Sequence, residues 1–461
     1  MSNNSLPEEW GKRLALIAAA VIVFSLCAIE EWQIDGHWFL PHAAITSADK
    51  FILADHDQVV AEATVSKLPT FTSTWHLWTT ADTGCGHYWR PLLWMGVWAE
   101  YQRFGVSGYA GYVACMVASH LLFLAGFAVV VKQITGRWSA ALLSVLFFAG
   151  SRAYPPMSWA NNLLFGDPLW SAGAAGDVAL VYWKDQAEMW HGAFVLLALY
   201  AALRGRWFLG IAGFAGAVLV KESGWLAPVL VLVVLLIEGR LREAPLRAWI
   251  GFIMVAALLV FGKVHAGLNL TASGNFHGMS GAPYRYFHLV GGRGLLGMTG
   301  VSWAAGVIGA GLGLVAALGV QRRVAWRAGL GTWAVLAACV AGIWAHVEGH
   351  GYVASLLAMF DPVCFLPLLL GEFVYAFCAV VVLCESAARR PMAILIAASL
   401  LGGLPTIVNA WETPHINYLT YSFQSAITAF VWVCVGDRIW DALSICAWPR
   451  LTALAKRPEA A

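Results

Sequence analysis

The sequence predicts an all-α polytopic membrane protein with about twelve transmembrane spans, on the evidence of its composition and of its apolar runs. Of the 461 residues, 60% are hydrophobic and only 12% are charged, and the mean hydropathy is +0.69. Soluble domains carry about 25% charged residues, so this composition excludes a water-soluble globular protein. The longer apolar runs reach the length of about 17 to 25 residues that a helix needs to cross a bilayer.

Twelve apolar runs divide the chain, and we treat residues 1–461 as one integral membrane domain. The run that follows Lys12 and Arg13 has no small-residue cleavage site after it, which predicts a signal anchor rather than a cleaved signal peptide. The expected spans are 13–29, 109–131, 138–151, 189–203, 207–221, 225–237, 248–264, 294–319, 327–345, 363–388, 391–408 and 421–437.

The distribution of charge predicts the orientation of these spans. Lys and Arg gather in alternate connections, and short loops rich in them stay in the cytoplasm. On the resulting topology both termini are cytoplasmic, and that side holds 18 of the 28 basic residues and 8 of the 26 acidic ones. The expected location is a cell inner membrane, with the acidic, chemically richer loops on the periplasmic or other extracytoplasmic face.

The connections differ in length, and this difference limits the possible functions. The first extracytoplasmic loop, 30–108, is long enough to carry short helices, and the second spans 152–188. Cytoplasmic loops have only a few residues and no nucleotide-binding fingerprint opens a helix, which argues against a nucleotide-driven enzyme or transporter. A net charge of +2 gives no field that would gather nucleic acid.

An acidic motif lies in the first extracytoplasmic loop, where Asp55, His56 and Asp57 occur in FILADHDQVV. On an extended segment two carboxylates two residues apart point to the same side. They can bind a divalent cation or divide into a base and a partner that orients it. The alternative is a solvated polar loop.

Two basic motifs follow. Arg90 lies in YWRPL, at the expected membrane surface, and presents a planar fork that suits phosphate; the alternative is a snorkelling side chain in an aromatic belt. Lys221 and Glu222 lie in VKESGW and are the only charged residues in 207–237. Ionisable groups at such depth are functional candidates, although the two side chains can also simply pair with each other.

Several aromatic and polar residues in the outer loops suit a sugar, because an aromatic face packs on its ring and polar groups bind its hydroxyls. We expect weaker substrate contacts from these residues than from the motifs, since any interfacial loop has a similar composition. The candidates are His56, Tyr88, Trp159 and His191.

Taken together, these motifs resemble the GT-C superfamily of membrane glycosyltransferases, and within it the protein O-mannosyltransferases and related enzymes that use polyprenyl-phosphate sugars. The resemblance covers roughly the first 240 residues. It consists of the acidic pair Asp55 and Asp57, then YWRPL around Arg90, then the pair Lys221 and Glu222, in the order that the family has them.

The resemblance implies transfer of a hexose or pentose from a polyprenyl-phosphate carrier to an acceptor hydroxyl on a protein, lipid or glycan, by inverting displacement. Asp55 is the expected base and Asp57 its orienting or cation-holding partner, but His56 departs from the family pattern and leaves Asp57 as an alternative base. Arg90 and Lys221 would bind the donor phosphate, with Glu222 holding Lys221. No cofactor is assigned with certainty, and a divalent cation held by Asp55 and Asp57 is an alternative to a metal-free reaction.

Two other functions fit the same sequence. A polytopic transporter or lipid-carrier flippase would also have about twelve spans, but it would show charged or interrupted segments near the membrane midplane. A noncatalytic membrane scaffold would tolerate changes at Asp55, Arg90 and Lys221.

Overall fold

The computed structural model describes residues 65–80, 89–105, 109–151, 183–267, 382–383, 385–404, 419–420 and 422–437. Within these ranges the regular structure is entirely helical, which confirms the predicted class. Two segments are long and apolar enough to cross a membrane, Ala118–Thr135 and Leu246–His265. The arrangement of twelve spans includes residues outside these ranges and stays a prediction.

The helices agree with most of the expected runs that fall in the described residues. The run expected at 391–408 is displaced, because α20 begins at Ser386 and continues through Arg389 and Arg390; hydropathy marks where apolar residues begin, not where the helix does. The elements are η3 (Phe71–Trp75), α4 (His76–Thr79), α5 (Pro91–Phe104), α6 (Tyr109–Thr135), α7 (Trp138–Ser151), α10 (Trp183–Leu203), α11 (Trp207–Val220), η5 (Glu222–Leu226), α12 (Ala227–Glu238), η6 (Leu241–Glu243), α13 (Leu246–His265), α20 (Ser386–Gly402) and a last helix at 422–437.

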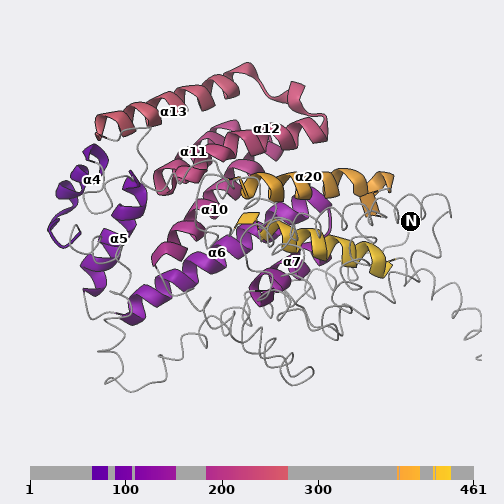
Figure 1. The fold of residues 1–461 in the computed structure, drawn as a ribbon, viewed down its shortest axis with the longest axis horizontal. Coiled ribbons are helices and arrows are strands. Elements are labelled where there is room, and N and C mark those ends of the chain that lie inside the picture. The colour runs from indigo at the N-terminus through magenta and orange to yellow at the C-terminus, as the bar shows by residue number, and fades with distance from the viewer. Residues whose placement is uncertain are drawn as a thin grey trace, which may run out of the picture.

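The long helices lie side by side (Figure 1), and the largest side chains buried among them are phenylalanines. Small residues let the helices approach closely, as in other membrane helix pairs. A methyl group at Gly213 of α11 would lie 2.7 Å from the backbone nitrogen of Ala198 in α10, and one at Gly192 would lie 2.6 Å from the ring of Phe123 in α6. These glycines therefore fix α10 between α11 and α6.

The short helices of the first loop lie beside one end of the long ones, which we call the loop end (Figure 1). Indole N–H groups attach them to each other. Trp98 of α5 donates to the carbonyl of Leu68 at 2.7 Å, and Trp89 donates to the carbonyl of Trp78 at 3.1 Å. The start of α5 is thereby held against α4.

The opposite end, which we call the arginine end, holds basic connections between the long helices. Arg240, after α12, donates from Nη1 to the carbonyl of Leu203 at the end of α10, at 2.9 Å. Arg137, before α7, pairs with Asp437 at the end of the last helix. Connections that the charge pattern assigns to the cytoplasm thus lie close together in space.

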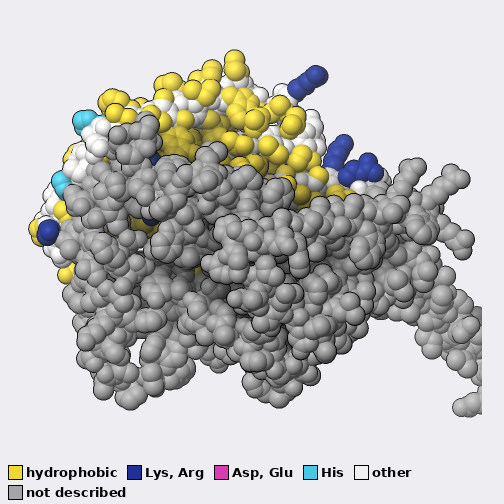
Figure 2. Space-filling view, viewed as in Figure 1, with side chains coloured by type: hydrophobic (Ala, Val, Ile, Leu, Met, Phe, Trp, Pro, Cys, Tyr) yellow, Lys and Arg dark blue, Asp and Glu magenta, His cyan; other side chains and the backbone are white. Residues whose placement is uncertain are grey.

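An apolar surface covers the outer side of α12 and α13, with Lys and Arg side chains at one edge (Figure 2). Large apolar side chains along α13 are more than half exposed, including Ile253 at 67%, Leu258 at 64% and Phe261 at 69%. Their spacing places them on one face of the helix. A continuous exposed apolar face is unfavourable in water and typical of contact with lipid or another apolar partner.

Candidate functional site

The residues proposed to bind the donor phosphate come together at the loop end. Arg90 precedes α5, whereas Lys221 and Glu222 lie in the turn after α11, and an ion pair spans the 132 residues between Arg90 and Glu222. We call Arg90, Glu188, Lys221, Glu222 and Lys263 the charged cluster. The other predicted site residues, Asp55, His56, Asp57, Tyr88 and Trp159, lie outside the described residues.

Local sequence fixes the position of Arg90. Pro91 occupies the first turn of α5, where its ring suits the helical φ angle and its missing N–H is not needed. Trp89 is 4% exposed and packs on α13, where a methyl group at Gly262 would lie 2.9 Å from its ring. The guanidinium is therefore carried by a backbone segment that is anchored on both sides.

The turn after α11 is equally constrained. Lys221 ends α11 in an extended conformation, and η5 begins at the next residue. A methyl group at Gly224 would lie 2.4 Å from backbone atoms of Ala217 and Val218. Because a backbone cannot yield as a flexible side chain can, the turn requires glycine at this position.

The ion pairs differ from the expected pairing of Lys221 with Glu222. Arg90 donates from Nε at 3.0 Å and from Nη2 at 2.7 Å to one oxygen of Glu222, Oε2. Lys221 instead pairs with Glu188 of α10. The physical reason is that Lys221 is extended whereas Glu222 starts a helical turn, so their side chains point toward different helices.

Glu222 is charged at neutral pH because of its basic neighbours. Burial raises the pKa of this carboxyl, but the Arg90 guanidinium and the Lys263 amine lower it by more, so that the pKa lies below its ordinary value of 4.5. Its second oxygen, Oε1, is buried and has no hydrogen-bond partner among the described residues. That oxygen can accept a hydrogen bond from a substrate hydroxyl.

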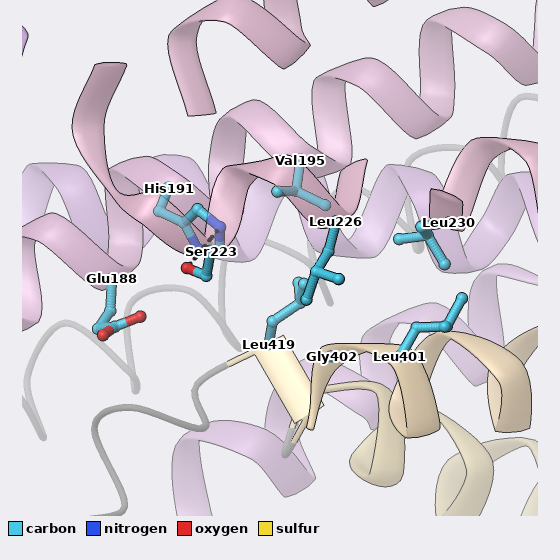
Figure 3. A pocket seen from close by; sticks show the side chains of 9 residues that line it. All are labelled: Glu188, His191, Val195, Ser223, Leu226, Leu230, Leu401, Gly402 and Leu419. Atoms are coloured by element: carbon cyan, nitrogen blue, oxygen red, sulfur yellow. Dashed lines mark hydrogen bonds between the residues drawn. The ribbon is translucent and has the colours of Figure 1, made fainter. Parts of the chain in front are cut away.

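His191 and Ser223 add a polar pair next to the cluster. The His191 Nε2 and Ser223 Oγ atoms are 3.1 Å apart, and the two side chains point toward each other (Figure 3). They line a small pocket of about 20 Å³, which has room for about one water molecule. Glu188 lies at its polar end, whereas Leu230 and Leu401 line the far end. The pocket is therefore too small to hold a lipid-linked sugar as it stands.

Sequence reasoning missed individual roles for Glu188, Ser223 and Lys263. Glu188 and His191 are three residues apart in α10, a spacing that places them on one helix face, and this signal was available. Ser223 adjoins the Lys221–Glu222 motif. Lys263 lies at the end of the expected span 248–264, much as Lys221 lies at the end of 207–221, but the packing of α13 against Trp89 could not be inferred.

Metal binding is limited to what the described residues can offer. Within those ranges, no group of three or more His, Cys, Asp or Glu side chains could hold a metal ion. The cation predicted at Asp55 and Asp57 concerns residues outside them.

No protein-family model matches the chain, and no curated protein or solved structure matches it either. The evidence for function is therefore the geometry of the charged cluster together with the motifs that lead to it.

Proposed function

We propose that this protein is a membrane glycosyltransferase that moves a sugar from a polyprenyl-phosphate carrier to an acceptor hydroxyl on the extracytoplasmic face. The observation that carries the proposal is the ion pair between Arg90 and Glu222, which joins two of the predicted motifs that lie far apart in the sequence. Lys221 precedes Glu222 in the chain and pairs with Glu188. Basic side chains of this kind neutralise a phosphate whose negative charge grows as the glycosidic bond breaks.

Each described side chain has a distinct part in this proposal. Arg90 and Lys221 bind the phosphate of the donor, and Glu222 orients Arg90 through the two hydrogen bonds to Oε2. The free oxygen of Glu222 accepts a hydrogen bond from a sugar hydroxyl. Glu188 holds Lys221. The lipid part of the donor lies along apolar surface, which explains why a membrane enzyme is required.

The base belongs to the first extracytoplasmic loop. Asp55 accepts the proton of the acceptor hydroxyl as the oxygen attacks the anomeric carbon, and the carrier phosphate leaves with the electrons of the broken bond. Asp57 orients Asp55 or holds a divalent cation, and the reverse assignment of the two carboxylates is the alternative. His56, Tyr88, Trp159 and His191 contact the sugar or the acceptor.

The membrane setting has two supports. Two described segments are long and apolar enough to cross a bilayer, and the apolar face of α13 is exposed. The basic connections also lie together at the arginine end, opposite the charged cluster (Figure 1). This separation agrees with a cytoplasmic arginine end and an active site on the opposite, extracytoplasmic face.

The test is sugar transfer by purified protein in lipid vesicles, using a panel of radiolabelled polyprenyl-phosphate hexoses and pentoses. Asp55→Asn should abolish transfer, and Arg90→Met or Lys221→Met should reduce it by about 10 to 1,000-fold if each acts as one charge-stabilising donor. Asp437→Asn, at the arginine end, is the control and should leave transfer unchanged.

Three outcomes would contradict the proposal. Full activity in both Asp55→Asn and Asp57→Asn would reject the acidic motif. Movement of labelled polyprenyl phosphate across the vesicle without sugar transfer would favour the flippase or transporter. Unchanged behaviour in every variant at Asp55, Arg90 and Lys221 would favour a scaffold.

A further inference from the structure

Lys263 is a buried cation that the proposed reaction leaves without a role. It lies in the last turn of α13 and is 7% exposed. Its amine lies 6.0 Å from the ring centroid of Trp225, a cation–π contact. Within the part of the chain that the structure describes, the amine makes no hydrogen bond or ion pair. Lysines are almost never fully buried without such a partner.

The surroundings of Lys263 place it in the charged cluster. Glu222 and Arg90 are the charged groups whose fields act on it. Trp89 packs against Gly262, the residue before Lys263. This part of α13 therefore contacts the segment that carries Arg90. The contact with Trp225 adds an attachment to η5. Lys263 is thus held near Arg90 by packing rather than by a carboxylate.

The described residues of the cluster hold more basic than acidic side chains. Arg90, Lys221 and Lys263 are basic, whereas Glu188 and Glu222 are acidic. His191 adds no negative charge in either protonation state. A buried site with excess positive charge is stabilised by an anion, because desolvated charges need partners of opposite sign.

We propose that Lys263 is a third cationic ligand for the phosphate group of a polyprenyl phosphate, beside Arg90 and Lys221. The identity of the lipid rests on the proposed function, whereas the choice of an anion rests on the excess of basic side chains among the described residues of the cluster and on the burial of Lys263. Lys263 approaches from α13, Arg90 from the start of α5 and Lys221 from the end of α11. The charges of Arg90 and Lys263 both act on Glu222, so these two cations lie on one side of the cluster, and an uncharged polyprenol offers them nothing.

The test compares binding of polyprenyl phosphate and polyprenol to the full-length protein in detergent, by native mass spectrometry. The unmutated protein should prefer the phosphate, and Lys263→Met should reduce that preference by about 10 to 100-fold, as for loss of one hydrogen bond to a charged group. Lys263→Arg should retain the preference. If Lys263→Met fails to fold, the same comparison is made with Lys263→Gln, whose uncharged polar side chain is similar in length. The same loss of preference is expected for that variant.

The matched control is Lys132→Met. The amine of Lys132 also lies 6.0 Å from a tryptophan ring, that of Trp138, but at the arginine end. This variant should keep the full preference for the phosphate. A preference unchanged in Lys263→Met, or lost equally in Lys132→Met, would overturn the inference. Displacement of the lipid by inorganic phosphate at equal concentration would overturn the assignment to a lipid-linked phosphate.

The outcomes separate this inference from the proposed function. Phosphate binding that depends on Lys263, without any sugar transfer, would support the inference and reject the glycosyltransferase. Sugar transfer by Lys263→Met with an unchanged KM for the donor would reject the inference and leave the glycosyltransferase standing.

Discussion

The two ends of the helix bundle hold ion pairs in opposite surroundings. At the loop end, the side chains of Lys221 and Glu188 are 14% and 5% exposed. At the arginine end, those of Arg137 and Asp437 are 43% and 57% exposed. Burying an ion pair removes both groups from water at a large cost that their attraction offsets only in part. The loop end therefore retains charges that an apolar interior would not need for stability.

The tryptophan–lysine contacts show the same difference. Lys263 and Lys132 both lie 6.0 Å from an indole ring, but Lys263 is buried, at 7% exposed, whereas Lys132 is only partly buried. At the arginine end a long basic side chain can reach water while its stem covers apolar surface. At the loop end the amine is enclosed. Ionisable groups enclosed in this way in a membrane protein are generally functional.

The largest expected effect on stability comes from breaking the most buried pair. Glu188→Gln leaves the Lys221 amine without its carboxylate partner in a site with little access to water. The free energy of unfolding should fall by about 3–5 kcal/mol, measured by denaturation in detergent. Asp437→Asn removes the carboxylate of the exposed pair and should cost about 0–1 kcal/mol.

Equal losses of stability in Glu188→Gln and Asp437→Asn would contradict the difference between the two ends.

Replacing both partners of the buried pair, in the double variant Glu188→Leu with Lys221→Leu, tests this difference further. Because a buried pair can be replaced by apolar residues with little loss of stability, the double variant should be more stable than Glu188→Gln. Its sugar transfer should be reduced by about 10 to 1,000-fold, as expected for Lys221→Met, since Lys221 is lost.

An intermediate effect is expected at the turn that positions Lys221 and Glu222. Gly224→Ala would place a methyl group 2.4 Å from the backbone of α11 and should destabilise the protein by about 1–3 kcal/mol. Gly126→Ala in α6 is the control, since nothing lies within 4 Å of the added methyl group, and it should stabilise its helix by about 0.5–1 kcal/mol. Equal effects at both glycines would contradict the close contact.

The sequence predicts the helices of this protein better than their ends. Apolar runs locate α6, α7, α11 and α13 because burial in an apolar phase is set by composition alone. The start of α20 was misplaced, because arginines that end an apolar run are still good helix formers. Hydropathy therefore finds the element and misses the residue at which it begins.

The sequence predicted which described residues belong to the candidate site, but it did not predict which of them form ion pairs with each other. Arg90, Lys221 and Glu222 could be selected because charged residues beside apolar runs are rare. Which carboxylate meets which cation depends on the packing of α5, α10 and α13 around one turn, and no local pattern encodes it. Lys263 illustrates the limit, since its significance depends on a glycine that allows Trp89 to approach.

The smallest expected effect is the pH dependence of the Arg90–Glu222 pair, which lies between the two extremes with side chains 19% and 32% exposed. The folded-state pKa of Glu222 lies below 4.5, so its contribution to stability is present above pH 4.5 and is lost as the pH falls through the lower, folded-state pKa. Glu222→Gln should therefore be less stable than the unmutated protein at pH 7, and the difference should shrink under acid in detergent denaturation. Glu243→Gln, whose carboxylate pairs with Arg240 and is 60% exposed, is the control and should show a smaller difference at pH 7. A difference for Glu222→Gln that grew as the pH fell would contradict the depressed pKa.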